Sequence, residues 1–192
     1  MGRSKEFDEN VVLQKAMKLF WEQGYEKTSM NDLVEHMGIH RRSLYDTFGD
    51  KHTLFLRAVD YYQELIKREI QIKIAHTKTS KQAIQLVFES VIEGYNDSPR
   101  GCLMVNSATE MALYDKEVEE RVEKAFMEAE EMLIDIVRKG QETGEFSCDY
   151  KPEILGEILQ NSLLGIRVLL RTTESKEKMY RIADFFVNLL VK

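Results

Sequence analysis

The strongest constraint on this fold lies between residues 24 and 55, where a glycine separates two short helical patterns. The first pattern ends before Gly38, and the second places Leu44 and Phe48 four positions apart on one inward face. Each pattern is too short to form a stable helix alone, so each must be held by a partner. This arrangement predicts a helix-turn-helix.

The outer face of the second pattern carries hydrogen-bond donors. Arg41, Arg42 and Tyr45 fall there, on a short helix of the kind that enters the major groove of DNA. A bidentate arginine–guanine contact contributes about 1–3 kcal/mol of discrimination between bases. Hydroxyl, amide and ammonium groups at helix starts bind phosphate. We therefore expect DNA contacts from Thr28, Ser29, Arg41, Arg42, Ser43, Tyr45 and Lys51.

The net charge of −6 is distributed unevenly along the chain. Residues 1–57 hold nine Lys or Arg and nine Asp or Glu, so the whole acidic excess lies in the remaining residues. We expect the acidic part to face away from DNA. Affinity would then come from local placement of cations rather than from a bulk field.

The remaining patterns predict further helices. Their ranges, with the one that precedes the helix-turn-helix, are about 8–24, 50–75, 80–95, 102–113, 115–143, 152–172 and 175–191, with Asp8, Asp115 and Ser175 as N-caps. Only 2 prolines and 10 glycines occur in 192 residues, and the alternation typical of strands is absent. The expected fold is all-α. A three-helix DNA-binding head (residues 1–55) would precede a larger helical-bundle body (residues 56–192) that binds an effector and dimerises.

The last two predicted helices carry apolar stripes wider than a solvent-facing helix requires. The stripes either cover the core of the body or form the four-helix seam of a homodimer. The homodimer is favoured because a short recognition helix gains specificity by doubling. We expect this seam to include Ile158, Ser162, Gly165, Ile166, Leu169, Ile182, Phe185, Phe186 and Leu189.

Methionines and aromatic residues at helical spacing in the body indicate either core or the wall of an apolar effector pocket. The candidate wall residues are Tyr62, Tyr95, Cys102, Met104, Met111, Phe126 and Leu163. Cys102 follows Arg100 and Gly101 at an expected helix start, where a thiol becomes more reactive toward oxidants or electrophiles. The alternative is that Cys102 is a small buried hydrophobic residue.

The sequence contains no catalytic constellation or cofactor motif, so we expect neither an enzyme nor a bound cofactor. His36 and His40 have the spacing of a helical metal pair, but Gly38 lies between them, and we expect no metal site. There is no apolar run near 18 residues and no apolar leader. These features predict a soluble cytoplasmic protein with no membrane partner.

Several motifs in residues 8–55 resemble the N-terminal signature of TetR/AcrR-family transcriptional regulators. They are Gly24-Tyr25, Thr28-Ser29-Met30, Asp32-Leu33-Val34, Gly38-Ile39 and Ser43-Leu44-Tyr45, with Phe48 and Lys51. In the body, the runs RGCLMVN, GQETGEF and LLGIRVLL are similar to one C-terminal subgroup of that family. The resemblance implies an all-α homodimer that binds a palindromic operator and is released by a small effector. We expect the protein to act as a repressor.

The resemblance also implies roles by position. Phosphate contacts would come from Thr28 and Lys51, and groove contacts from Arg41, Arg42 and Tyr45. His40 departs from the family, which usually has Ser or Thr there. Because imidazole is a poorer N-cap, either the helix start is shifted or His40 itself contacts DNA. The alternative function is a helical ligand- or partner-binding protein without sequence-specific DNA binding.

Overall fold

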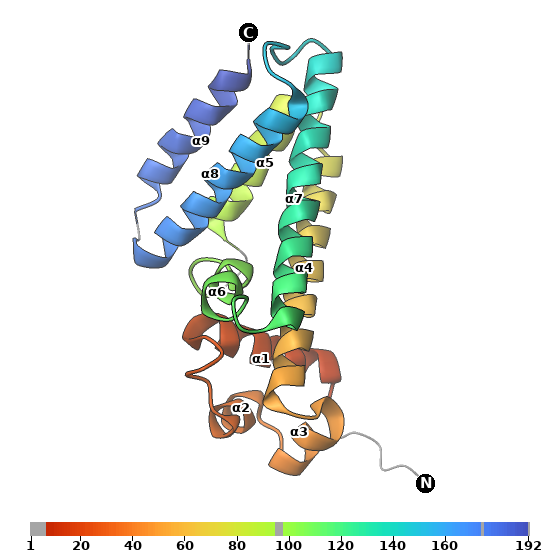
Figure 1. Ribbon diagram of the computed structural model, residues 1–192, viewed down its shortest axis with the longest axis vertical. Helices are drawn as coiled ribbons and strands as arrows, with labels where there is room; N and C mark the ends of the chain where they lie inside the picture. The colour runs from red at the N-terminus through yellow and green to blue at the C-terminus, as the bar shows by residue number, and fades with distance from the viewer. Residues whose placement is uncertain (1–6, 95–97, 174, 192) are drawn as a thin grey trace.

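The computed structural model describes residues 7–94, 98–173 and 175–191. These residues form α1 (Glu9–Gln23), α2 (Met30–Met37), α3 (Arg41–Phe48), α4 (Lys51–Ala75), α5 (Ser80–Glu93), α6 (Leu103–Glu110), α7 (Lys116–Glu142), α8 (Pro152–Thr172) and α9 (Glu177–Leu190). Apart from one isolated β-bridge between Phe146 and Val191, the described ranges contain no strand pairing. The all-α prediction is confirmed (Figure 1).

Side-chain caps explain where three of the helices begin. The Asp8 carboxylate accepts a hydrogen bond from the backbone N–H of Asn10 at 2.8 Å. Ser29 and Asp32 form a capping box, in which each side chain accepts from the backbone N–H of the other residue, at 3.1 and 2.8 Å. Asp115 accepts from two N–H groups in the first turn of α7, both at 3.1 Å. The predicted caps Asp8 and Asp115 are confirmed.

The start of α9 differs from the prediction. Lys176, rather than Ser175, occupies its N-cap position, and no side chain caps the helix there. The Lys176 ammonium instead donates to Glu93 Oε2 at 2.7 Å, and the Tyr180 hydroxyl donates to the same carboxylate at 2.5 Å. Long-range contacts with α5 therefore replace a local cap.

The helices α1, α2 and α3 lie together at one end of the molecule and form the head (Figure 1). Gly38 joins α2 to α3 with φ of 71°, a left-handed conformation that favours glycine. Leu44 and Phe48 of α3 are buried, as the spacing predicted. The helix-turn-helix is thus held by an apolar inner face.

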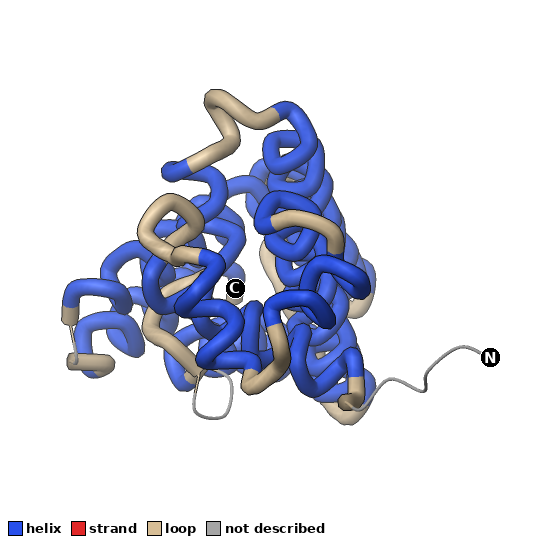
Figure 2. The backbone as a smooth tube through the Cα atoms, turned by 90° about the horizontal axis from the view of Figure 1, so that it is seen from below, coloured by secondary structure: helices blue, strands red, loops and turns tan. Residues whose placement is uncertain are grey.

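The body extends away from the head along two long helices, α4 and α7, which lie side by side (Figure 1). The helices α5 and α8 pack beside their far ends, α9 packs against α5, and α6 lies where the head meets the body. Gly156 lets α8 approach α7 closely, because a Cβ added there would come within 2.4 Å of Ile134 Cγ1. Figure 2, seen from the head end, shows only helices and loops among the described residues.

The apolar core has two parts. The first combines α1 to α4 with α6 and the start of α7, including Met104, Val118 and Val122. The second joins the far half of α4 with α5, α7, α8 and α9. Because the first part crosses residue 55, the head shares its core with α6, although the two lie far apart in sequence. The division into residues 1–55 and 56–192 stays a prediction.

No helix within the described ranges has both the length and the apolar character that crossing a membrane requires.

Candidate DNA-binding surface and effector cavity

The exposed face of α3 presents three large polar side chains. Tyr45 is 44% exposed, and the Arg42 side chain is 92% exposed, 3.6 Å from Asp46. Arg41 Nη1 donates to Asn31 Oδ1 of α2 at 2.9 Å, and the Arg41 guanidinium lies 5.9 Å from the centre of the Tyr45 ring. The structure therefore brings the predicted groove residues together on one accessible surface.

The other predicted DNA contacts border this surface. His40 is exposed at the N-cap position of α3 and makes no capping hydrogen bond through its side chain. Ser29 is exposed at the start of α2, and Ser43 is half-buried on α3. Lys51 opens α4, and its ammonium lies 4.1 Å from the centre of the Tyr25 ring. That cation–π contact holds the charge near the helix start.

Thr28 departs from its predicted role. Its side chain is fully buried, and its hydroxyl donates to the carbonyl oxygen of Gly24 at 2.6 Å. The hydroxyl is therefore used to hold the turn between α1 and α2 and is not available to a phosphate.

The body holds the end of α1 through contacts that the sequence did not reveal. Glu110, at the end of α6, accepts from the backbone N–H groups of Tyr25 at 3.0 Å and Glu26 at 2.9 Å. The Trp21 carbonyl oxygen accepts from Asn106 Nδ2 of α6 and Arg171 Nη1 of α8, both at 3.3 Å. These side chains satisfy backbone groups that a helix end leaves unpaired. We call Asn106, Glu110 and Arg171 the head clamp.

A second link joins the starts of α4 and α7. His52 Nε2 lies 2.7 Å from Asp115 Oδ2. Burial favours a higher pKa for Asp115, but hydrogen bonds from the Val118 N–H and from His52 lower that pKa overall. The Asp115 carboxylate thus both caps α7 and contacts the helix that leaves the head.

A cavity of about 120 Å³ lies between α4, α6, α7 and α8. Five of the predicted wall residues line it: Tyr62, Cys102, Met104, Phe126 and Leu163. Met111 does not line it and packs instead in the core shared by the head and α6, so that part of the prediction is wrong. Tyr95 lies outside the described residues.

The cavity also has polar lining residues that the sequence analysis missed. Gln160 and Arg167 come from α8, within its apolar stripe. At the other side, Glu128 of α7 is 2.9 Å from Lys67 Nζ and 3.3 Å from Gln63 Nε2, both in α4. An adjoining cavity of about 40 Å³ shares part of this wall and is also lined by Trp21 of α1. This second cavity therefore reaches the head.

Cys102 is buried between the two cavities and lines both. The Tyr62 hydroxyl donates to its Sγ at 3.3 Å. Burial raises the pKa of Tyr62 well above its ordinary value, Cys102 raises it further, and the charge of Arg167 opposes both effects. Cys148, in contrast, is exposed.

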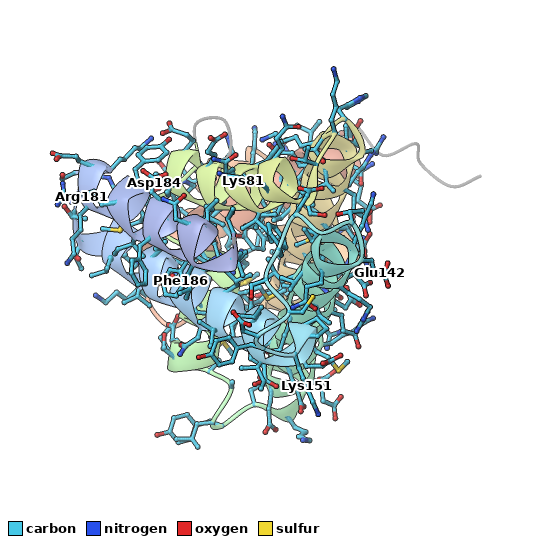
Figure 3. All side chains as sticks on the ribbon, turned by 90° about the horizontal axis from the view of Figure 1, so that it is seen from above. Lys81, Glu142, Lys151, Arg181, Asp184 and Phe186 are labelled. Carbon is cyan, nitrogen blue, oxygen red and sulfur yellow. The ribbon has the colours of Figure 1, made fainter. Side chains whose placement is uncertain are left out.

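The predicted dimer seam divides into exposed, half-buried and buried residues. Ile158, Phe185 and Leu189 are 41%, 63% and 52% exposed, and no heavy atom lies within 4 Å of a Cβ added at Gly165. The half-buried members are Ser162, Leu169, Ile182 and Phe186. Ile166 is only 1% exposed and belongs to the body core, so its assignment to the seam is wrong. Figure 3 shows the flanking Arg181 at the outer margin of α9.

His36 and His40 lie on different helical segments. His36 belongs to the last turn of α2, and His40 precedes α3. The turn at Gly38 therefore removes the shared face that a helical metal pair needs. Across the described ranges, no three His, Cys, Asp or Glu side chains form a group that could hold a metal ion.

Two family models match the chain in order. Residues 12–58 match bacterial regulatory proteins of the tetR family, and residues 80–186 match the tetracyclin repressor-like C-terminal domain. The uncharacterized HTH-type transcriptional regulator YezE of Bacillus subtilis (strain 168) is 32% identical over 193 residues, covering 99% of this chain and 100% of YezE. The HTH-type transcriptional repressor ComR of Escherichia coli (strain K12) is 32% identical over 192 residues, covering 98% of this chain and 91% of ComR.

The solved structures give the same result. A cysteine mutant of the TetR-family transcriptional regulator CifR, complexed with 26-bp double-strand operator DNA, superposes with a TM-score of 0.87. It is 27% identical, and the match covers 98% of this chain and 100% of that one. Both the head and the body thus match proteins of one family along nearly their whole length. This chain belongs to the TetR family of transcriptional regulators.

Proposed function

We propose that this protein is a repressor that binds a palindromic operator as a homodimer and releases it when a small effector occupies the body. The face of α3 carries the proposal, because Arg41, Arg42 and Tyr45 are exposed on a helix whose apolar residues are buried. The likeness to ComR, which is named a repressor, and to CifR in complex with operator DNA supports it.

In this proposal, Arg41, Arg42 and Tyr45 reach base edges and the adjoining backbone in the major groove. His40 and Ser43 extend the same surface, while Ser29 and Lys51 contact phosphates from helix starts. Because residues 1–57 have no net charge, affinity depends on where these cations lie.

Dimerisation would use the exposed stripe of α8 and α9, including Ile158, Gly165, Phe185 and Leu189. Two heads would then read half-sites about 34–36 Å apart, in successive turns of one DNA face. An effector can release DNA only by binding better to a different spacing of the heads. The cavity at Tyr62 suits this task because it lies against α4, which begins in the head.

The effector would be a largely apolar molecule held without a covalent bond. One observation favours a second route: Cys102 lines both cavities, so an electrophile or oxidant that enters them would meet its thiol. In either case we expect the protein to act in the cytoplasm by binding alone, without catalysis and without a cofactor.

The test is fluorescence-anisotropy binding to the DNA directly upstream of the gene for this protein, against a scrambled duplex. Tight, salt-dependent preference for the upstream DNA is the expected result. Equal affinity for both duplexes would instead support the helical binding protein that does not read DNA. The same DNA also tests the cysteine route after treatment with N-ethylmaleimide.

Two variants separate the cysteines. If Cys102 is the switch, treatment releases DNA from the wild type and from Cys148→Ser, but not from Cys102→Ser. If treatment leaves DNA bound in all three proteins, Cys102 is a packing residue and the effector is non-covalent.

A further inference from the structure

Two buried polar atoms beside the cavities have no hydrogen-bond partner among the described residues. Gln160 is 4% exposed and lines the larger cavity, and its Oε1 is unpaired. Trp21 is 3% exposed and lines the smaller cavity, and its Nε1 is unpaired. Buried polar groups are almost always hydrogen-bonded, so each atom marks a place where a ligand atom would be stabilised.

The two atoms require opposite partners. Gln160 Nε2 donates to the carbonyl oxygen of Phe126 at 3.5 Å, which orients the amide and leaves Oε1 as an acceptor. The indole Nε1 of Trp21 can only donate. A ligand that satisfies both therefore offers a donor to Gln160 and an acceptor to Trp21.

Arg167 gives the Trp21 end a positive charge. Its side chain lines both cavities and makes no hydrogen bond or ion pair with another described residue. Glu69 also lines the smaller cavity, but its carboxylate is paired with Lys73 at 2.5 Å. One uncompensated guanidinium suits a singly charged acceptor, and a carboxylate matches its planar donors with two parallel hydrogen bonds.

The space between the two ends is apolar. Gln160 and Arg167 are two turns apart on one face of α8, about 10 Å along the helix axis. Leu163 lies between them, and Met132 and Leu133 of α7 line the same cavity. A dry cavity of roughly 150 Å³ holds a benzene ring, and the two adjoining cavities, with about 120 and 40 Å³, together offer a similar volume, so the apolar body is no larger than one ring.

We propose that the effector is a small hydroxy acid with an apolar body. Its carboxylate binds Arg167 and the Trp21 N–H, its body contacts Leu163, and its hydroxyl donates to Gln160 Oε1. The proposal rests on the proposed function in treating this cavity as the effector site. Because Trp21 belongs to α1, the bound carboxylate contacts the head directly.

The test uses calorimetric titration of the full chain without DNA, with three matched probes. Para-hydroxyphenylpropionate carries both polar groups, phenylpropionate lacks the hydroxyl, and para-propylphenol lacks the carboxylate. We expect the hydroxy acid to bind at least about tenfold more tightly than either analogue, because phenylpropionate leaves Gln160 Oε1 unpaired and para-propylphenol leaves Arg167 and the Trp21 N–H unpaired. Equal affinity for all three probes, or no binding of the hydroxy acid, overturns the proposal.

Two variants assign each preference to its residue. Gln160→Leu should bind the hydroxy acid and phenylpropionate equally, and the double variant Arg167→Met with Trp21→Phe should bind the hydroxy acid and para-propylphenol equally. Retained binding of the matched analogue is the control for folding in each variant. If a variant still binds the hydroxy acid more tightly than the matched analogue, the role assigned to the substituted residue is overturned.

A separate anisotropy experiment keeps the two proposals distinguishable. The hydroxy acid should displace the wild type from its upstream DNA. Binding of the acid by a protein that does not prefer this DNA would overturn the proposed function and leave the ligand class standing. Preference for the upstream DNA without binding of the acid would overturn the ligand class and leave the proposed function standing.

Discussion

Glu110 accepts a hydrogen bond from the backbone N–H of Tyr25 at 3.0 Å, across 85 positions of sequence. Its second oxygen accepts from Glu26, so one carboxylate of α6 holds both N–H groups of the turn that follows α1. Arg171 of α8 binds the Trp21 carbonyl oxygen at the end of the same helix. The head clamp therefore fixes the head to two body helices, both of which line the larger cavity.

Removing the carboxylate from the head clamp should loosen the head. Glu110→Ala is expected to lower the free energy of unfolding by about 1–2 kcal/mol, because two backbone N–H groups lose a charged acceptor. Urea denaturation followed by circular dichroism measures this change. Glu120→Ala removes an exposed carboxylate from α7 and should have little effect. Equal losses in both variants would contradict the role of Glu110.

Arg42 should contribute to sequence preference. Its side chain is 92% exposed and has only a 3.6 Å contact with Asp46, so Arg42→Ala should leave the fold intact. We expect a loss of about 1–3 kcal/mol of discrimination at one base pair of each half-site. A randomised-site selection measures this preference, with the exposed Arg68→Ala of α4 as the control. An unchanged selected sequence would remove Arg42 from the set of groove contacts.

Lys51 should contribute to the affinity for DNA without affecting the preference for one base sequence over another. If its ammonium contacts a phosphate, Lys51→Ala should weaken binding to every duplex and reduce the slope of log affinity against log salt by about 1. The cation–π contact with Tyr25 offers a purely structural alternative, in which stability falls but the slope does not change. Anisotropy at several salt concentrations separates the two, with the exposed Lys78→Ala as the control.

The capping box of α2 should make stability depend on pH in the acid range. The hydrogen bonds with Ser29 hold the pKa of Asp32 below its ordinary value of 3.8. The stabilisation is therefore complete above pH 3.8 and is lost as the pH falls through the lower folded value. Asp32→Asn should be less stable than the wild type near neutral pH. Chemical denaturation near neutral pH and below pH 3.8 should show that the difference in unfolding free energy between the two proteins becomes smaller in acid. A difference that does not depend on pH would contradict the assignment.

The exposed apolar stripe should be needed for assembly. Phe185 is 63% exposed, and Phe185→Asp places a charge at the centre of the proposed seam. We expect a monomer with native helical content and much weaker operator binding, measured by sedimentation velocity and anisotropy. Ile72→Asp changes a residue of α4 that is 52% exposed and should stay dimeric. A dimeric Phe185→Asp protein would place the seam elsewhere.

Most helix ends could be predicted from the sequence because they depend on neighbours a few positions away, whereas the start of α9 depends on contacts with α5. Asp8, Ser29 and Gly38 act within one turn of their own backbone. Thr28 and Ile166 were misassigned because their burial depends on packing that local spacing does not report. Ile166 shows this directly: it has the same helical spacing as its exposed neighbours on α8 but faces the body core.

The cavity was only partly predictable for a related reason. An apolar pattern identifies residues such as Met104 and Leu163, since a wall and a core use the same side chains. The pattern did not identify Gln160, because a single glutamine in an apolar stripe does not by itself indicate a binding site. Its importance depends on the unpaired Oε1, which only the structure shows. The head clamp likewise joins residues too far apart in sequence for any local pattern to reveal.

The packing of the molecule depends little on the outer face of α3. Its buried residues, Leu44 and Phe48, hold the helix, while Arg42 and Tyr45 project outward. Substitutions on the outer face can therefore accumulate over evolutionary time without rebuilding the scaffold beneath. Descendants of one ancestral gene could in this way acquire new target sequences while keeping the same inner framework.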